Sequence, residues 1–146
     1  DLAPLVTLIA AGGEARPDAV VGYRIERADP LVRRIYANVY RSALRAMYGL
    51  RLRDVDCAAK VFRRDALAGV AIDSQGAFFS AELMIKLRAR DARIVEVGVP
   101  HYPRTSGAAT GARLSVVLGA VRDFWRLRIA LWINAAAALR QGAPLI

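Results

Sequence analysis

Cysteine, histidine and lysine are scarce in this chain of 146 residues. It has one cysteine, Cys57, and one histidine, His101. A lone cysteine excludes an internal disulfide and a cysteine-rich metal site, and a lone histidine argues against a histidine-based metal centre. Only two of the 22 basic residues are lysines, Lys60 and Lys86, so arginine supplies nearly all the positive charge.

The charge balance limits the classes of partner. Hydrophobic residues make up 55% and charged residues 24% of the chain, which is the composition of a folded domain rather than a disordered one. A formal net charge of +9 attracts phosphates, nucleic acid or anionic lipid surfaces. Arginine presents a planar fork that fits phosphate oxygens. Charge alone does not choose among these partners.

The chain begins at Asp1 without a methionine and runs directly into the apolar segment Leu2 to Ala11. That segment has no basic region before it and is too short for a membrane span or a signal peptide. We therefore expect a helix there, and we expect the chain to be a fragment of a longer protein.

Apolar periodicity and turn residues predict alternating helices and strands. Asp29 and Pro30 are typical of a helix start, Gly49 of a helix end, and Ser80 is a plausible helix cap. This alternation predicts an α/β fold. The predicted elements are a helix over 1–11, a strand over 19–23, a helix from 29–30 to 49, a strand at 61–62, a helical turn over 65–68, a helix over 80–89, a strand over 94–99, a loop over 104–111 and a helix over 114–139.

Four segments, in this order and at these intervals, resemble the second half of a family 2 glycosyltransferase with a GT-A fold. Residues 20–24 are similar to the strand of that family that ends in Gly-Ser-Arg. Residues 53–64 resemble its segment of an aspartate, a short turn, a basic residue and Phe-Arg-Arg. Residues 79–83 resemble its helix with a Glu-Leu pair. Residues 94–107 resemble its Glu-Val-Pro-Val strand followed by Arg-x-x-Gly.

The members most similar are dolichol- and polyprenol-phosphate mannosyl- and glucosyltransferases. The resemblance implies transfer of a hexose from a GDP- or UDP-sugar to a lipid phosphate, by a peripheral protein at the cytoplasmic face of the plasma membrane. In such enzymes the first half of the fold binds the nucleotide, and an Asp-x-Asp motif there holds Mg²⁺ or Mn²⁺. That half is missing, so residues 1–111 are expected to be the acceptor-side portion of the domain, inactive alone, with an incomplete sheet.

The resemblance also implies which residues carry the chemistry. A lipid phosphate oxygen is already anionic, so the reaction needs positioning and cations more than a strong base. Candidate catalytic carboxylates are Asp54 and Glu82. The candidate phosphate- and acceptor-binding residues are Arg24, Arg33, Lys60, Arg104 and Ser106.

Each of these residues also has a structural interpretation. Arg24 and Arg33 could be ordinary surface arginines, and Asp54 could cap a turn and pair with Arg53. Glu82 lies among apolar neighbours, where it either pairs with an arginine or faces the site and binds sugar hydroxyls. Arg104 stands in the segment that resembles the loop closing over the phosphates.

The last segment, 112–146, predicts a basic amphipathic helix at a membrane surface, because it combines Trp125 and Trp132 with several arginines. The alternative is a packed terminal helix with a solvated basic face. Two further functions remain open: a non-catalytic basic membrane-surface module, and a nucleic-acid-binding module. The second is disfavoured because the sequence has no aromatic stacking platform, zinc spacing or helix-turn-helix pattern.

Overall fold

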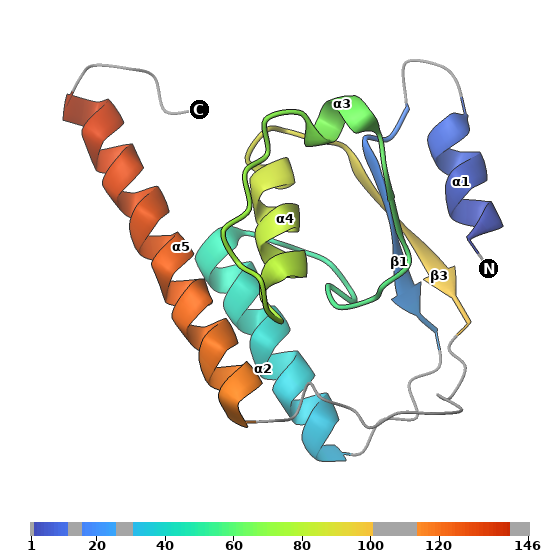
Figure 1. The fold of residues 1–146 in the computed structure, drawn as a ribbon. Coiled ribbons are helices and arrows are strands. Elements are labelled where there is room, and N and C mark those ends of the chain that lie inside the picture. The colour runs from blue at the N-terminus through green and yellow to red at the C-terminus, as the bar shows by residue number, and fades with distance from the viewer. Residues whose placement is uncertain (1, 12–15, 26–30, 101–113, 141–146) are drawn as a thin grey trace.

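The computed structural model describes residues 2–11, 16–25, 31–100 and 114–140. Three strands form a small sheet, and helices lie on both of its faces (Figure 1). This is a mixed α/β arrangement, as the sequence predicts. The elements in chain order are α1 (Ala3–Ala10), β1 (Ala19–Arg24), α2 (Leu31–Tyr48), β2 (Lys60–Phe62), α3 (Arg64–Leu67), α4 (Phe79–Arg88), β3 (Ile94–Val99) and α5 (Leu114–Arg140).

The sheet has the order β2-β1-β3, with β1 in the centre. β1 pairs in parallel with β3, from Ala19 opposite Ile94 to Arg24 opposite Val99. It pairs antiparallel with β2, where Val20 lies opposite Val61. A parallel pair brings the carboxyl ends of both strands to one edge of the sheet. That edge therefore holds the residues that follow β1 and β3.

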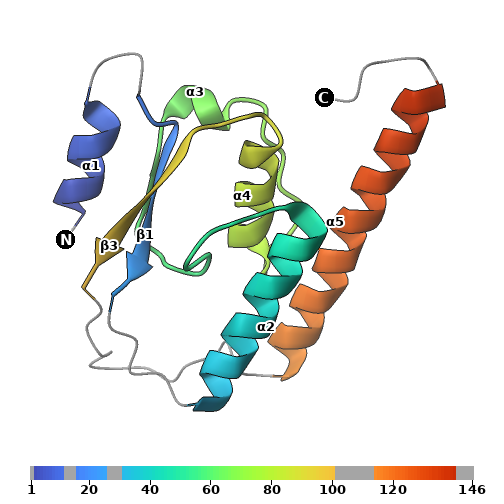
Figure 2. The ribbon, with the colours of Figure 1, turned by 180° about the vertical axis from the view of Figure 1, so that it is seen from behind.

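Successive side chains of β1 point to opposite faces of the sheet, so the buried residues form two separate clusters. Ala19 and Val21 face the helices α2, α4 and α5, and belong to the main core with Leu44 and Phe78. Val20 faces the other way and packs with Leu5 of α1 in a smaller cluster. Figures 1 and 2 show α1 on one face of the sheet and the three longer helices on the other.

An aromatic cluster joins the two longest helices to the core. The ring of Tyr48 in α2 lies edge-on to Phe124 in α5, with centroids 5.0 Å apart, and Phe78 packs against Phe124 at 5.9 Å. The Tyr48 hydroxyl donates a hydrogen bond to the backbone carbonyl of Phe124. These contacts hold α2 and α5 side by side.

Most of the predicted elements are confirmed, with bounds that agree to within a few residues. Gly49 ends α2 with φ +66°, and the backbone N–H of Leu50 bonds back to the carbonyl of Leu44, a glycine helix end of the expected kind. The expected cap Ser80 is wrong: α4 begins one residue earlier, and Phe78 stands at the cap position with no side-chain bond. Asp29, Pro30 and the predicted loop over 104–111 lie outside the described residues.

Both α2 and α5 leave apolar side chains exposed. In α2, Leu31, Ile35 and Val39 follow the expected helical spacing but face away from the core, whereas Leu44 is buried. In α5, Trp125 and the 70%-exposed Trp132 belong to a similar stripe. Among the helices described, none is both long enough and apolar enough to cross a membrane.

Candidate functional site

The carboxyl end of β1 carries a partly buried ion pair between Arg24 and Asp54. The Nε atom of Arg24 lies 2.5 Å from Oδ2 of Asp54, and Nη2 lies 2.9 Å from Oδ1. The guanidinium and the carboxylate thus form a two-pronged contact, in which each oxygen accepts a charge-assisted hydrogen bond. Only 15% of the Arg24 side chain and 5% of the Asp54 side chain is exposed.

Gly22 allows the segment that contains Asp54 to lie against β1. Its backbone N–H donates to the carbonyl of Ala59 at 2.7 Å. A Cβ at this position would come within 3.0 Å of both the Cβ and the carbonyl oxygen of Ala59, so only glycine fits without a shift. The close approach explains the glycine in the Val-Gly-Tyr-Arg strand and places residues 54–60 beside Arg24.

Lys60 lies in the same region, at the first residue of β2. Its ammonium group donates a hydrogen bond to the backbone carbonyl of Cys57. Burial lowers the pKa of Lys60, while the charges of Cys57, Asp56 and Asp54 act in the opposite direction. Because Asp54 and Arg24 both influence this pKa, the three predicted residues form one electrostatic cluster. We call Arg24, Asp54 and Lys60 the β1-edge cluster.

The remaining predicted phosphate-binding residues are not brought into this cluster by the described structure. Arg33 stands on the exposed part of α2, in the first turn after Leu31. Arg104 and Ser106 lie outside the described residues, although they follow β3, whose carboxyl end adjoins that of β1. Their roles stay predictions.

Glu82 is buried in α4 and holds a loop. Its Oε1 accepts hydrogen bonds from the backbone N–H of Asp73 at 3.1 Å and from Lys86 at 2.6 Å, and its Oε2 accepts one from the N–H of Ser74 at 2.9 Å. Burial alone would raise its pKa, but these bonds, led by that of Lys86, lower the pKa to about 2. Glu82 therefore pairs with a lysine, not with an arginine as one of the two alternatives has it, and it fixes residues 73–74. That it is also a catalytic carboxylate stays a prediction.

The residues described here do not form a site for the divalent metal that the resemblance implies. Among them, no three histidine, cysteine, aspartate or glutamate side chains are placed to hold a metal ion. Both oxygens of Asp54 accept hydrogen bonds from Arg24, so this carboxylate is a poor metal ligand.

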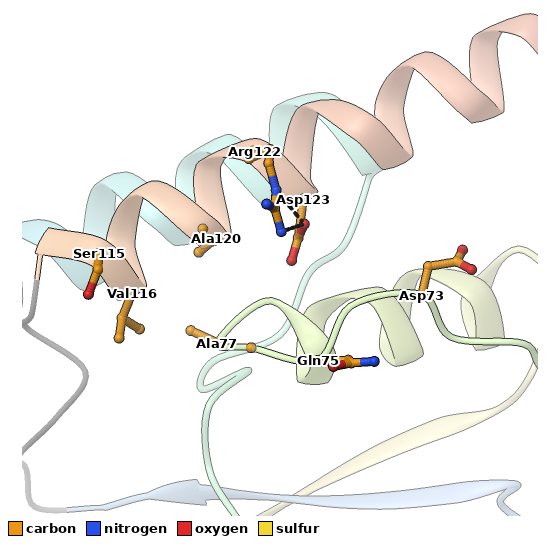
Figure 3. Close-up of a pocket in the computed structure, with 10 residues that line it drawn as sticks. Asp73, Gln75, Ala77, Ser115, Val116, Ala120, Arg122 and Asp123 are labelled. Carbon is orange, nitrogen blue, oxygen red and sulfur yellow. Dashed lines mark hydrogen bonds and ion pairs between the residues drawn. The ribbon is translucent and has the colours of Figure 1, made fainter.

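Sequence reasoning missed one polar feature, a cavity of about 260 Å³ between α5 and the loop before α4. The buried carboxylate of Asp123 lies on its wall (Figure 3). The available signal was the charge pattern of α5, because Asp123 is the one acidic residue in an otherwise basic helix. A buried carboxylate within a helix needs a hydrogen-bond donor or a cation as its partner.

The β1-edge cluster can hold an anion next to a strand edge. Arg24 and Lys60 lie in the same region as the carboxylates of Asp54 and Asp56, and Asp54 fixes the orientation of the Arg24 guanidinium. Ligands of open α/β sheets bind outside the carboxyl ends of the strands, which is where Arg24 stands. The geometry therefore suits recognition of a phosphate group, which accepts hydrogen bonds from cationic donors.

Comparison with known proteins finds that the sequence is similar to proteins named glycosyltransferases. No family model matches the chain, and no solved structure matches it either. The chain is similar to proteins of Mycobacterium tuberculosis and Mycobacterium bovis that are named uncharacterized glycosyltransferases, with 30% identity over 131 residues. The match covers 87% of this chain and 58% of each of those proteins. The chain is thus related over most of its length to rather more than half of a mycobacterial glycosyltransferase.

Proposed function

We propose that this chain is the acceptor-side portion of a family 2 glycosyltransferase with a GT-A fold. The enzyme transfers a hexose from a GDP- or UDP-sugar to a lipid phosphate such as polyprenyl phosphate. The similarity to proteins named glycosyltransferase supports the general activity. Because the chain spans 58% of their length, the proposal assigns nucleotide and metal binding to residues beyond this chain.

In the proposed reaction, an oxygen of the lipid phosphate attacks the anomeric carbon of the sugar. A new carbon–oxygen bond forms there, and the bond from that carbon to the nucleotide diphosphate breaks. The diphosphate leaves with the electron pair as GDP or UDP. No proton has to be removed from the acceptor, because its phosphate is already ionised at neutral pH. The protein has to hold two anions close together, and cations do so.

The observation that carries the proposal is the partly buried pair of Arg24 and Asp54 at the carboxyl end of β1. An arginine that only solvated the surface would not be held by both oxygens of a buried carboxylate. This contact preorganises the guanidinium, so that a phosphate meets a fixed donor. Lys60 adds a second cation in the same region.

The proposal is tested by assaying the full-length protein that contains this chain. Membranes from cells that express it should transfer radiolabelled hexose from one GDP- or UDP-sugar into a lipid fraction, and only when polyprenyl phosphate is supplied. Arg24→Lys should keep the protein folded but lower the rate, because an ammonium cannot reproduce the two-pronged contact. Transfer to no lipid acceptor from any donor would contradict the proposal and favour a non-catalytic module.

We further propose that the exposed apolar stripes of α2 and α5 rest on an anionic membrane surface. The two helices lie side by side, and their first residues point to the same end of the molecule as the carboxyl ends of β1 and β3 (Figures 1 and 2). Both helices also carry arginines, whose positive charge is opposite to that of acidic lipid head groups. The exposed apolar residues are Leu31, Val32, Ile35, Tyr36 and Val39 in α2, and Leu114, Val117, Leu118, Val121, Trp125, Ile129, Trp132 and Ile133 in α5.

Binding to vesicles should depend on both the stripe and the charge. Trp132→Ala should weaken binding to phosphatidylserine-containing vesicles about tenfold, since it removes an indole that the membrane would bury. Arg33→Gln should weaken it about fivefold, and only at low salt. Co-sedimentation measures both effects. Leu67→Ala, which changes a 37%-exposed apolar residue of α3, is the control and should bind like the parent. Equal binding by all three variants would contradict the proposed surface.

A further inference from the structure

The backbone of Arg53 is held by side chains from two different elements. Its N–H donates a hydrogen bond to Oε1 of Glu96 in β3 at 2.7 Å, and its carbonyl accepts one from Nη1 of Arg41 in α2 at 3.0 Å. The next residue, Asp54, is fixed by Arg24 of β1. Arg53 is exposed, yet its backbone stands in a segment that is attached to three elements. A fixed backbone is the first requirement of a preorganised binding residue.

The side chain of Arg53 is held as well, by an aromatic ring. The Cζ atom of its guanidinium lies 4.6 Å from the centre of the Tyr23 ring in β1, which is a cation–π contact. Tyr23 stands opposite Gly98 of β3. A Cβ at Gly98 would come within 3.2 Å of the Tyr23 hydroxyl, so the missing side chain gives this ring its space. Tyr23 thus forms a flat support for the guanidinium.

The stacked guanidinium keeps its capacity to donate hydrogen bonds. Among the residues that the structure describes, no oxygen accepts a hydrogen bond from its N–H groups and no carboxylate pairs with it. These N–H groups lie in the plane of the guanidinium, so a contact with an aromatic face leaves them open at the edge. Pairs of such N–H groups fit the oxygens of a phosphate. Arg53 therefore combines a fixed orientation with donors that are open to an anion.

Arg53 and Arg24 flank the carboxyl end of β1, which lies beside the carboxyl end of β3 (Figure 1). Tyr23 and Arg24 are successive residues of β1, so their side chains point to opposite faces of the sheet. Arg53 contacts Tyr23 on the face that α2 covers, whereas Arg24 points to the other face. A phosphate outside the end of the strand can thus be approached from two sides by guanidinium groups, each oriented by its own partner.

We propose that Arg53 is a further phosphate-binding residue at the carboxyl end of β1, and that Tyr23 is its positioning residue. The ligand is the phosphate monoester of the lipid acceptor, because Arg53 is bonded to α2, which belongs to the proposed membrane surface. Such a phosphate carries about two negative charges at neutral pH, which the guanidinium groups of Arg24 and Arg53 would balance. The inference rests on the proposed function and names the cation that meets the acceptor.

The test follows the side-chain Nε–Hε signals of Arg24 and Arg53 in the ¹⁵N-labelled chain by two-dimensional NMR. The probe is isopentenyl phosphate, a short prenyl phosphate, and the corresponding alcohol is the uncharged control. The phosphate should shift both signals with one common Kd, and the alcohol should shift neither. A shift of the Arg24 signal alone would overturn the role of Arg53 and leave the proposed function standing. A shift of neither signal would contradict both.

A matched pair of arginine variants separates a bound phosphate from a general effect of charge. Arg53→Gln should weaken binding of isopentenyl phosphate about tenfold, because a charge-assisted contact is lost. Arg51→Gln removes the same charge from an exposed arginine two residues away, and should change the Kd by less than about twofold. If both variants weaken binding equally, the phosphate responds to net charge only and the proposal is wrong.

The role of Tyr23 depends on the face of its ring. Tyr23→Leu should weaken binding about fourfold, since it removes the cation–π contact. Tyr23→Phe keeps that face and should bind like the parent. Urea midpoints of both variants show whether the fold is intact. Equal binding by a folded Tyr23→Leu variant and the parent would overturn the positioning role.

The acceptor is distinguished from the donor in the full-length protein that contains this chain. Arg53→Gln should raise the KM for polyprenyl phosphate about tenfold and leave the KM for the nucleotide sugar unchanged. Arg51→Gln should change neither constant. A higher KM for the nucleotide sugar alone would assign Arg53 to the donor diphosphate and overturn its role at the acceptor.

Discussion

Replacing Arg24 with methionine should lower the free energy of unfolding by about 3–5 kcal/mol. The substitution keeps much of the side-chain length but removes both guanidinium donors to Asp54. The carboxylate would then be left 5% exposed without the two strong bonds at 2.5 and 2.9 Å that compensate its burial. Urea denaturation followed by circular dichroism measures the loss, as a lower midpoint at an unchanged slope.

A double variant distinguishes the loss of the ion pair itself from the cost of leaving the Asp54 carboxylate buried without its guanidinium partner. The double variant Arg24→Met/Asp54→Leu removes both charges and should recover most of the lost stability, because an apolar pair is tolerated where a lone carboxylate is not. Arg88→Met, an exposed arginine of α4, is the control and should change stability by no more than about 0.5 kcal/mol. If Arg24→Met behaves like Arg88→Met, the ion pair does not stabilise the fold.

This ion pair also limits how the β1-edge cluster can work. Asp54 fixes Arg24 through both oxygens, so the guanidinium would meet a phosphate in one orientation and lose little entropy on binding. Under the proposed function, Asp54 would be a positioning residue that acts through Arg24. The ion pair between Arg24 and Asp54 helps to hold residues 53–60 against the sheet. It would also keep the guanidinium of Arg24 in the orientation that binds an anion.

The secondary structure could be predicted from the sequence because its signals are local. The β-branched run over 94–99 and the apolar run over 19–23 each predict a strand, and Gly49 predicts the end of α2. Ser80 failed as a cap because the chain enters α4 through Phe78, whose burial in the aromatic cluster sets where the helix begins. In that case tertiary packing overrode a local preference.

The partners of the polar residues could not be predicted in the same way. Arg24 and Asp54 are 30 residues apart, and their contact depends on how closely residues 54–60 approach Gly22. The apolar neighbours of Glu82 indicate that its carboxylate needs a partner. They do not indicate that the backbone N–H groups of residues 73 and 74 are among its hydrogen-bond donors. Asp123 faces a cavity that exists only because α5 crosses the loop before α4. Long-range packing decides each case.

Acid should remove on the order of 3 kcal/mol of stability through Glu82 alone. Hydrogen bonds in the folded protein lower the pKa of this carboxyl from 4.5 to about 2. The folded state therefore binds its proton less tightly than the unfolded state does. Its contribution is fully present above about pH 4.5 and is lost progressively as the pH falls toward 2. Urea midpoints recorded between these two limits measure the slope.

Glu82→Gln should remove this contribution at neutral pH and flatten the slope between pH 4.5 and 2. Glutamine keeps the shape, but its amide group would place donors against the N–H groups of Asp73 and Ser74 or against Lys86, all of which donate. Asp65→Asn, at an 85%-exposed carboxylate of α3, is the control and should leave the acid slope unchanged. If Glu82→Gln keeps the parent slope, another carboxyl governs the acid response.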